Sequence, residues 1–437
     1  MPRTIQDAVK LTRAMGKEYI WIDALCIEQA EGDVPGDWEI EASKVGDYYA
    51  GAECLISAMR AAESEDGFLT ERVSWRYQRR ILLASGETLC KREKMYFWAQ
   101  APGQSFHHEK TSEPLLERGW CLQERILCPR RLHWTKNGLF WECNNEILAE
   151  QDPFIKHFSF KYHHGNQDLG PITIFGDEKS IGLVDRWSHL AEQYSKMRLS
   201  YEKDRFAAIH GLASRLAKRH NDTYYAGVFQ SKLAYGLLYK YGEAAKKMAR
   251  STYSTGPSWS WVGAPGIGWC QTWHPGHVSL VELVAFPISP GSSVRTDFTD
   301  LDSRKLRIRA PLVEIYGWGD CEHCENSDTP WSHNTIVEVK VFKTEDLAVD
   351  LDFRGGELNV EFDPGSVLMP KGNMLSPFLA AVLMQPGNQH LCGIILQKGY
   401  KDNKELYTRE GVFSIDGIFT SRETIRAGLS KSEITIV

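Results

Sequence analysis

The first sixty residues alternate between amphipathic and uniformly apolar segments. Residues 4–15 place Ile5, Ala8 and Met15 on one stripe, which predicts a helix. The run 19–24 begins with four aromatic or β-branched residues and predicts a strand buried on both faces. A helix over about 38–49 and a second buried strand over 53–58 follow. We therefore expect a βαβ unit with two parallel strands.

Helical and hairpin signals come next. Residues 114–127 have helical periodicity between Pro114 and Pro129, so a helix is expected there. Segments 131–135 and 139–143 flank Lys136-Asn137-Gly138 and predict a β-hairpin.

The rest of the chain has a different pattern. Residues 150–180 are polar and resemble a linker, and helical periodicity returns over 183–220 and 224–248. After residue 255, short alternating segments predict strands at 306–309, 336–341, 358–362 and 391–396, as in a sandwich or open barrel. We predict an α/β domain over 1–150, a mainly helical region over 151–250 and a β-rich domain over 251–437.

Composition narrows the class of protein. The chain has 437 residues, too many for one ordinary core, and a net charge of −6 without a basic domain, so we expect no nucleic-acid partner. No apolar run reaches the ~18 residues that span a bilayer, and residues 1–7 have no apolar core of a secretory signal. A cytoplasmic protein that does not enter membranes is expected. The Cys321-x-x-Cys324 pair has no second ligand pair at finger-like spacing, so no metal site is predicted.

Two carboxylates are candidates for chemistry. Asp23 falls at the carboxyl end of the expected strand 19–24, where open α/β sheets bind ligands, but it is equally able to cap the following turn. Glu124 lies one helical turn after Trp120, at the margin of the apolar arc, where burial would raise its pKa. Arg118 and Arg125 flank it and suit phosphate. The alternative is an ordinary amphipathic helix with marginal charges.

Several motifs resemble one family. The run Tyr-Ile-Trp-Ile-Asp-Ala-Leu-Cys-Ile-Glu-Gln at 19–29 resembles the "L-W-I-D-x-x-C-I-x-Q" motif of the heterokaryon incompatibility (HET) domain. Residues 118–127 resemble its "R-G-W-x-x-Q-E-x-x-L" motif, and 139–143 its trailing "W-E-C". Segments 257–261 and 407–413 are similar to stretches of the C-terminal parts of these proteins.

The resemblance implies a fungal protein of non-self recognition and cell death. The family is thought to be distantly related to Toll/interleukin-receptor (TIR) domains, which have a flavodoxin-like open parallel sheet and some of which cleave NAD. Residues 120–124 match the W-C-x-x-E pattern that carries the TIR catalytic glutamate, so the resemblance implies Glu124 as catalytic. Asp23 is the second catalytic candidate, from its place at the end of the expected strand. NAD is then a substrate rather than a resident cofactor. The candidate substrate-binding residues are Trp120, Arg118, Arg125 and Trp21.

One departure from the family is visible. The usual opening strand, "Y-x-x-L-S-Y-x-W-G", does not precede the helix at 4–15. In a flavodoxin-like sheet that strand is central. We expect a shortened form, a replacement strand or a changed function.

Three functions stay open. The first is a cell-death signalling protein, with or without NAD cleavage through Glu124. The second is a repurposed enzyme of small-molecule biosynthesis, with His133 and His210 as further acid–base candidates, although a structural or surface histidine is the favoured interpretation of each. The third is a non-catalytic interaction module with a protein partner or a second copy of the chain. The sequence holds no P-loop, G-x-G-x-x-G after a strand, G-x-S-x-G or H-E-x-x-H, which removes the commonest nucleotide-binding, hydrolase and zinc-protease classes.

Overall fold

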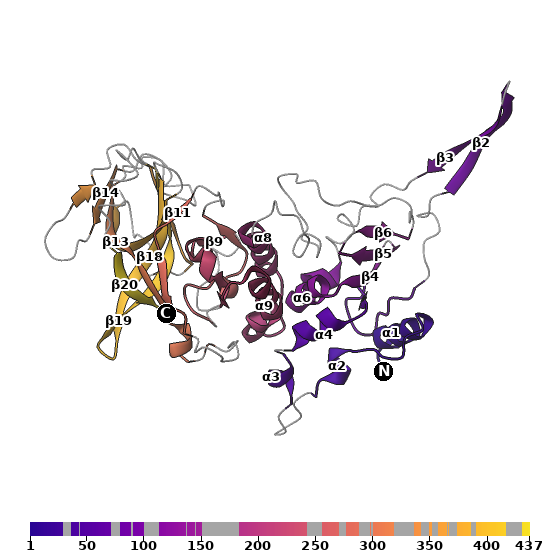
Figure 1. Ribbon diagram of the computed structural model, residues 1–437, viewed down its shortest axis with the longest axis horizontal. Helices are drawn as coiled ribbons and strands as arrows, with labels where there is room; N and C mark the ends of the chain where they lie inside the picture. The colour runs from indigo at the N-terminus through magenta and orange to yellow at the C-terminus, as the bar shows by residue number, and fades with distance from the viewer. Residues whose placement is uncertain are drawn as a thin grey trace. The chain divides into compact units, whose positions relative to one another are not determined.

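A computed structural model provides the architecture of the chain (Figure 1). It describes residues 1–28, 36–42, 44–70, 79–88, 91–99, 113–136, 138–144, 146–150, 183–242, 256–270, 277–287, 298, 300–318, 336–341, 349–351, 357–364, 366, 374–385, 390–416 and 431–437. The expected loop 150–180 and the Cys321-x-x-Cys324 pair lie outside these residues.

The chain divides into two compact units. Unit 1 comprises Met1–Ile181, Met197–Leu199 and Ala207–Leu212, and unit 2 comprises Gly182–Lys196, Ser200–Phe206 and Ala213–Val437.

Unit 1 begins with helix α1 (Arg3–Ala14), which confirms the helix predicted at 4–15. The buried Asp7 carboxylate accepts hydrogen bonds from the backbone amides of Phe68 at 3.0 Å and Leu69 at 3.1 Å. Ala8 packs with Phe68 and Trp134 in a small core. The helix is therefore held by its polar side as well as its apolar stripe.

The strand predicted at 19–24 is wrong. Residues 19–22 form no strand and pair with none in the described part of the chain, and Asp23–Cys26 forms the short helix α2. Trp21 packs instead against Tyr48 and Tyr49, with ring centroids 5.3 and 5.5 Å apart. The aromatic ring of Trp21 therefore packs against a helix. A run of apolar residues in the sequence does not show whether the run packs against a helix or pairs within a sheet. Tyr19 is 87% exposed, so this run is not buried on both faces.

The helix predicted at 38–49 is divided into α3 (Trp38–Glu41) and α4 (Val45–Gly51). The strand predicted at 53–58 is β1 (Leu55–Ser57). It pairs in parallel with β4 (Arg130–Thr135) and not with residues 19–24. The expected βαβ unit is therefore absent from the described residues.

The hairpin prediction is confirmed. β4 pairs antiparallel with β5 (Gly138–Cys143), which pairs antiparallel with β6 (Ile147–Ala149). The resulting sheet has the order β1-β4-β5-β6 and is short and mixed. It does not confirm the flavodoxin-like open parallel sheet. A separate hairpin consists of β2 (Arg79–Thr88) and β3 (Lys91–Ala99).

The helix predicted at 114–127 consists of a 3₁₀ turn, η2 (Pro114–Glu117), followed by α6 (Gly119–Leu127). Helix α6 packs against α4 (Figure 1). At this junction Gly46 of α4 meets Gly211, which lies in α9 (Ala207–His220), so closely that a Cβ on Gly46 would stand 3.0 Å from the Gly211 Cα.

Unit 2 contains α8 (Leu183–Ser195), η3 (Glu202–Arg205) and most of α9, as expected for 183–220. The helix predicted at 224–248 is mostly wrong. The described residues there form β7 (Tyr224–Tyr225), β8 (Val228–Phe229), η4 (Gln230–Lys232), α10 (Leu233–Leu237) and β9 (Tyr239–Tyr241). Strand β9 pairs with β10 (Ile267–Trp269), which follows the 3₁₀ turn η6 (Trp261–Gly263).

A tight turn explains the break in that helix. Ala226 and Gly227 both have positive φ, 44° and 98°, as the two central residues of a hairpin turn require. The Gly227 carbonyl accepts from the indole nitrogens of Trp187 at 2.9 Å and Trp261 at 2.7 Å. Tertiary hydrogen bonds therefore hold a turn where local periodicity favours a helix.

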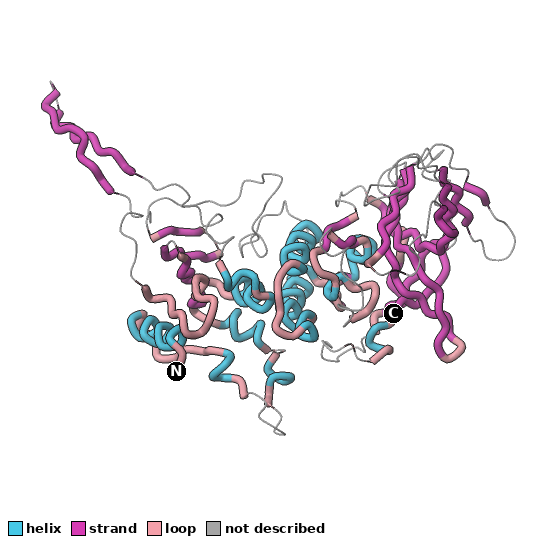
Figure 2. Tube along the Cα trace, turned by 180° about the vertical axis from the view of Figure 1, so that it is seen from behind, coloured by secondary structure: helices cyan, strands magenta, loops and turns pink. Residues whose placement is uncertain are grey.

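The remainder of unit 2 is a ten-stranded sheet among the described residues (Figure 2). Its elements are β11 (Val278–Ser279), β12 (Glu282–Ala285), β13 (Leu306–Trp318), β14 (Ile336–Val341), β15 (Val349–Leu351), β16 (Glu357–Phe362), β17 (Met374–Gln385), β18 (His390–Lys401), β19 (Lys404–Asp416) and β20 (Lys431–Ile436), with the 3₁₀ turn η7 (Asp302–Arg304) before β13. The β-rich prediction is confirmed at all four segments named from the sequence.

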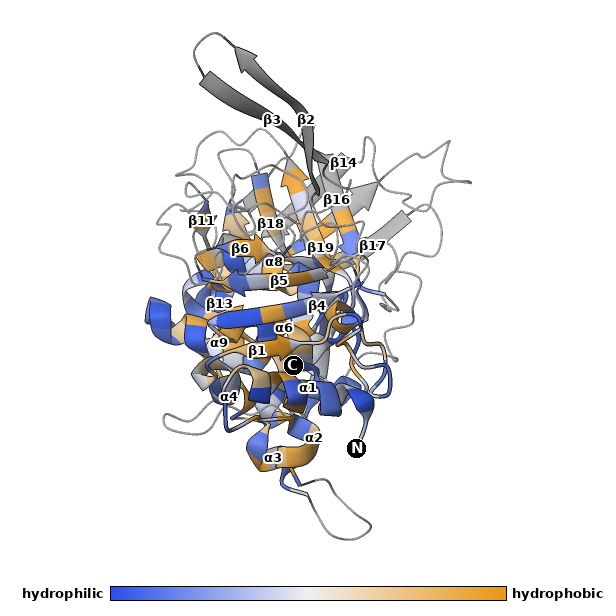
Figure 3. Ribbon diagram, turned by 90° about the vertical axis from the view of Figure 1, so that its right-hand side faces the viewer, coloured by the Kyte–Doolittle hydropathy of each residue, from blue (hydrophilic) through white to orange (hydrophobic). Residues whose placement is uncertain are grey.

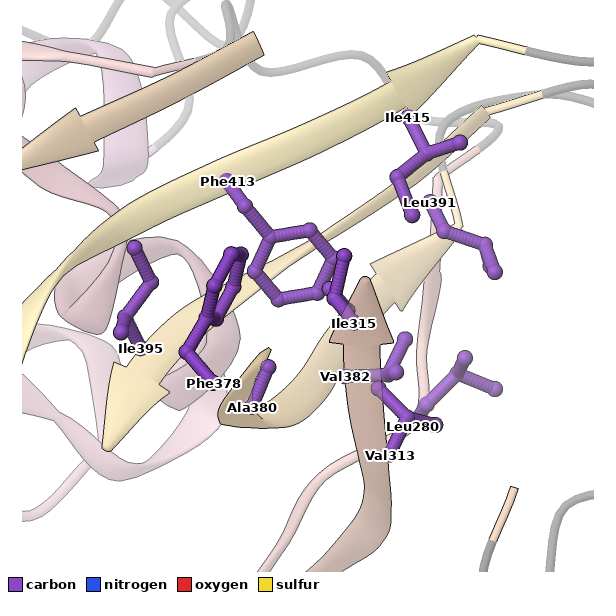
Figure 4. Close-up of a cluster of buried hydrophobic side chains, with 10 residues drawn as sticks. All are labelled: Leu280, Val313, Ile315, Phe378, Ala380, Val382, Leu391, Ile395, Phe413 and Ile415. Atoms are coloured by element: carbon purple, nitrogen blue, oxygen red, sulfur yellow. The ribbon is translucent and has the colours of Figure 1, made fainter. Parts of the chain in front are cut away.

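The pairings of this sheet close on themselves. β13 pairs with both β17 and β20, and β17, β18, β19 and β20 pair in succession. Figure 3 shows orange, hydrophobic stretches along the strands. Side chains from β13, β17, β18 and β19 gather into one buried cluster that includes Phe378, Ile395 and Phe413 (Figure 4). Burial of this cluster is the main source of stability for the sheet.

Candidate functional site

Gly119 fixes the point at which helix α6 begins. The Gly119 amide donates to the Arg198 carbonyl at 2.8 Å, and the Arg198 amide donates to the Glu117 carbonyl at 2.7 Å. A Cβ at residue 119 would stand 2.8 Å from Leu199 Cδ2. Gly119 therefore permits the backbone before Trp120 to lie close to residues 198–199. This contact fixes where α6 begins, and so it fixes the positions of the side chains along the helix.

Glu124 is half-buried on α6. Its pKa is raised to about 7, first because burial disfavours the carboxylate and second because Asp23 places a negative charge nearby. Arg118, the Tyr49 hydroxyl and the Cys121 thiol oppose the rise, the last two by hydrogen bonding. The structure thus brings Asp23 and Glu124, one hundred residues apart in sequence, into one electrostatic neighbourhood.

Asp23 has the capping role that the sequence allowed, and it stays a candidate for the site. It begins α2, and its Oδ1 accepts a hydrogen bond from the Ala24 amide at 2.8 Å, so it stabilises a turn. The side chain is exposed and its charge acts on Glu124, Tyr49 and Cys121. Two carboxylates with one partly desolvated create a negative potential that suits a positively charged group of a ligand.

Several aromatic residues neighbour the two carboxylates, and one of them, Tyr49, hydrogen-bonds Glu124. Trp21, which precedes Asp23, packs against Tyr48 and Tyr49. Trp120, one turn before Glu124, packs edge-on against Trp38 with centroids 5.2 Å apart. All five rings are half-buried, so each retains an accessible part. Rings of this kind can stack on a planar heterocycle.

The two arginines of α6 differ. Arg118 is exposed, and its charge acts on Glu124 and Cys121, so it remains a candidate for a phosphate. Arg125 is 3% exposed and donates two hydrogen bonds of 3.0 Å to the Glu142 carboxylate. Its guanidinium is held in the interior by Glu142. Arg125 was predicted to bind the ligand, and the structure gives it a structural role instead.

Glu142 is the centre of a buried cluster. Besides Arg125, it accepts from His133 Nε2 at 2.8 Å and lies 3.3 Å from Arg131 Nε. Burial would raise the Glu142 pKa, but the Arg125 charge and the His133 hydrogen bond hold it well below its usual range. Arg131 also donates to the carbonyls of Arg125 and Cys128 at the end of α6. The cluster therefore anchors the helix that carries Glu124 to the β4–β5 hairpin.

Neither of the two histidine candidates, His133 and His210, carries a charge at neutral pH. Burial lowers the pKa of His133 to about 4, and the ring donates to Glu142. Burial likewise lowers the pKa of His210, on α9, to about 4. Both are neutral at pH 7, as structural histidines are. The described residues hold no group of three or more His, Cys, Asp and Glu side chains placed to bind a metal.

Sequence reasoning missed Tyr49, Cys121 and Glu142. Tyr49 had one usable signal, because it belongs to the helix between the two HET-like motifs. Cys121 stands in the W-C-x-x-E match, but a buried thiol is most often a small apolar side chain, so no role was assigned to it. Glu142 shares the inward face of β5 with Phe140, and a carboxylate at a buried strand position demands a cationic partner.

The comparison with protein families matches the N-terminal part of the chain. The family model described as "Heterokaryon incompatibility protein (HET)" matches residues 1–124, which confirms the resemblance for that part of the chain and includes Asp23, Tyr49 and Glu124. No curated protein and no solved structure matches the chain significantly. None of the described helices is long and apolar enough to cross a bilayer.

Proposed function

We propose that this chain acts in heterokaryon incompatibility and cell-death signalling, and that Glu124 and Asp23 cleave the nicotinamide–ribose bond of NAD. The HET match over residues 1–124 supports the first part. The second part rests on one observation: a half-buried Glu124 with a pKa of about 7 stands beside Asp23 among aromatic rings. The distant TIR relationship implied by Trp120-Cys121-x-x-Glu124 points to the same reaction.

The chemistry suits this arrangement. Nicotinamide leaves with the electron pair of its bond to ribose C1′, which leaves an oxocarbenium-like cation on the sugar. A carboxylate at Glu124 stabilises that cation, and Asp23 adds to the negative potential. Water then adds to C1′ and releases a proton, giving ADP-ribose. Because the pyridinium ring of NAD is itself positive, its binding favours the ionised form of Glu124.

The ligand contacts are assigned from position. Trp120 and Trp21 offer ring surface for the nicotinamide or adenine. Arg118, exposed at the start of α6, would hold the pyrophosphate.

Nicotinamide release from NAD by the purified full chain tests the reaction. Glu124→Gln keeps the size of the side chain and removes its charge, so a loss of about 100-fold or more is expected; Asp23→Asn should lose about 10-fold. Glu117→Gln, at an exposed glutamate of η2, is the matched control and should retain the wild-type rate. Equal rates for wild type and Glu124→Gln, or no release by the wild type at any concentration, would rule out the reaction.

A second candidate, a non-catalytic interaction module, is favoured by one observation. Three large apolar side chains in this region are exposed: Tyr19 at 87%, Leu25 at 61% and Ile40 at 63%. Such side chains are usual at protein contacts. Cell death that survives Glu124→Gln but is abolished by replacing these three residues with Ser would favour this candidate.

A further inference from the structure

Unit 2 brings together two thiols from distant parts of the chain. Cys270 directly follows β10, and its backbone amide donates to the Leu238 carbonyl at 2.9 Å. Cys392 lies in β18 and is fully buried. Cys270 is only half-buried, so a small reagent can reach it.

The face of the sheet on which Cys392 lies is defined by its neighbours. Leu391 and Ile395 point into the cluster of Figure 4, so the alternation of a strand directs Cys392 to the other face. Leu396 lies four residues after Cys392 and therefore on the same face of β18. Arg409 of β19 pairs with Leu396, so its side chain lies on this face too. From there its guanidinium reaches the Tyr239 carbonyl of β9. The Cys392 face is therefore the one that meets the β9–β10 hairpin and the residue that follows it.

The two thiols interact directly. The hydrogen bond from Cys392 lowers the pKa of the Cys270 thiol, and the positive charges of Lys240 and Arg409 lower it further, against burial and the charge of Glu361. A half-buried thiol whose pKa is lowered, with a second thiol as its hydrogen-bond partner, has the features of a redox-reactive cysteine.

A second pair of neighbouring cysteines provides a contrast. Burial raises the pKa of Cys54 to about 11 and also raises that of Cys128. The Cys128 thiol donates to the Arg130 carbonyl at 3.2 Å rather than to Cys54. These two thiols stay protonated at neutral pH and should react slowly.

We propose that Cys270 and Cys392 form a peroxide-sensitive site that closes to a disulfide. The Cys270 thiolate attacks one oxygen of hydrogen peroxide, the O–O bond breaks, and after proton transfer a sulfenic acid and water result. The Cys392 sulfur then attacks the Cys270 sulfur, the S–O bond breaks, and a second water leaves with the Cys392 proton. Two thiols are oxidised and one peroxide is reduced. The proposal is independent of the NAD reaction.

Peptide mapping tests it in the intact chain. Trypsin places Cys270 in residues 251–295 and Cys392 in residues 372–398, each with a single cysteine. After brief exposure to hydrogen peroxide and alkylation, the non-reduced digest should contain the cross-linked pair, and dithiothreitol should remove it. The Cys54–Cys128 cross-link should form at least about tenfold more slowly, because reactivity follows thiolate content. Equal rates for the two pairs, or no link between Cys270 and Cys392, would overturn the proposal.

Single variants separate the roles of the thiols. Cys392→Ser should leave Cys270 as a sulfenic acid that dimedone traps, whereas Cys270→Ser should protect the buried Cys392 from oxidation. Circular dichroism confirms that each variant is folded, and Cys392→Ala replaces Cys392→Ser if the hydroxyl is not tolerated. Rapid oxidation of Cys392 in folded Cys270→Ser would contradict the assignment of Cys270 as the attacking thiol.

Discussion

Glu124 changes its charge within the physiological pH range, because burial and Asp23 raise its pKa to about 7 from an ordinary value of 4.5. The folded state therefore binds a proton more tightly than the unfolded state. Stability from this group is fully present below pH 4.5 and is lost as the pH rises through 7. The free energy of unfolding should fall over this interval by about 2–3 kcal/mol.

Glu124→Gln removes this dependence, since glutamine does not titrate. In urea unfolding we expect the variant to be about 2 kcal/mol more stable than the wild type at pH 8 and equal to it at pH 5. The Glu117→Gln control should follow the wild-type curve at both values. A variant that is less stable than the wild type at pH 8 would show that the carboxylate is stabilised, not strained, in the folded state.

Two ion pairs of unit 1 should respond very differently to the same substitution. Glu142→Gln leaves Arg125 and Arg131 buried without their carboxylate, at a cost of about 3–5 kcal/mol in unfolding free energy. Glu117 pairs with Arg198 at 3.5 Å, but the two side chains are 64% and 85% exposed. Glu117→Gln should therefore cost less than about 0.5 kcal/mol. Urea unfolding at pH 7 measures both, and similar losses would refute the difference.

At the level of single residues, the sequence identified Asp23, Glu124, Trp21, Trp120 and Arg118 as candidates that the structure places in one region. It did not separate Arg118 from Arg125. Helical periodicity shows which way a side chain points, but Arg125 is withdrawn by a carboxylate on β5. That partner becomes apparent only when the hairpin is docked.

At the level of elements, predictions held where local signals were strong. The helix at 4–15, the hairpin at 131–143 and the four late strands have periodicity or turn residues that few alternatives satisfy. Residues 19–24 failed because an aromatic run is equally stable against a helix as within a sheet. Residues 224–248 failed because a positive-φ turn at Ala226-Gly227 is held by indole hydrogen bonds from distant tryptophans.

The close contact of α4 with α9 predicts how glycine substitutions in α4 change the stability of unit 1. A Cβ on Gly46 would lie 3.0 Å from Gly211 Cα and 3.3 Å from Leu127 Cδ1, and backbone cannot move aside easily. Gly46→Ala should destabilise unit 1 by about 1–3 kcal/mol. Gly51→Ala, in the same helix but with nothing within 4 Å, should be neutral or stabilise by up to about 1 kcal/mol. Thermal melting measures both, and an unchanged Gly46→Ala protein would show that the helices separate readily.

At the level of the whole molecule, two segments singled out by family resemblance meet in space. Ser258 Oγ, from 257–261, accepts a hydrogen bond of 3.0 Å from the Arg409 amide, from 407–413. The Arg409 side chain is fully buried, donates to Asp363 at 2.7 and 2.5 Å and lies 3.8 Å from the Tyr239 ring centroid. These stretches therefore join the hairpin part of unit 2 to its sheet. The sequence identified the two segments 257–261 and 407–413. It did not predict the contact between them, because no local sequence pattern indicates which distant segments meet.

Arg409→Lys tests this junction. Lysine keeps the charge but loses the paired geometry and the flat contact with Tyr239, so we expect a loss of about 3 kcal/mol in unit 2 stability. Arg309→Lys is the control, because Arg309 forms only exposed pairs with Glu282 and Glu433 at 3.8 and 3.6 Å. Differential scanning calorimetry compares them. Equal melting temperatures would mean that charge alone suffices at position 409.

The pairing pattern of β13 also governs how quickly the molecule can assemble. This strand binds β20 along six residue pairs, beginning with Leu306 against Ile436, although the two are more than a hundred residues apart in sequence. Contacts of such long sequence separation form slowly, because loop-closure entropy is lost before any pairing energy is gained. Until β20 arrives, one edge of β13 stays open to pairing with another chain. Cells that make this protein therefore need either time or chaperones at that stage of its synthesis.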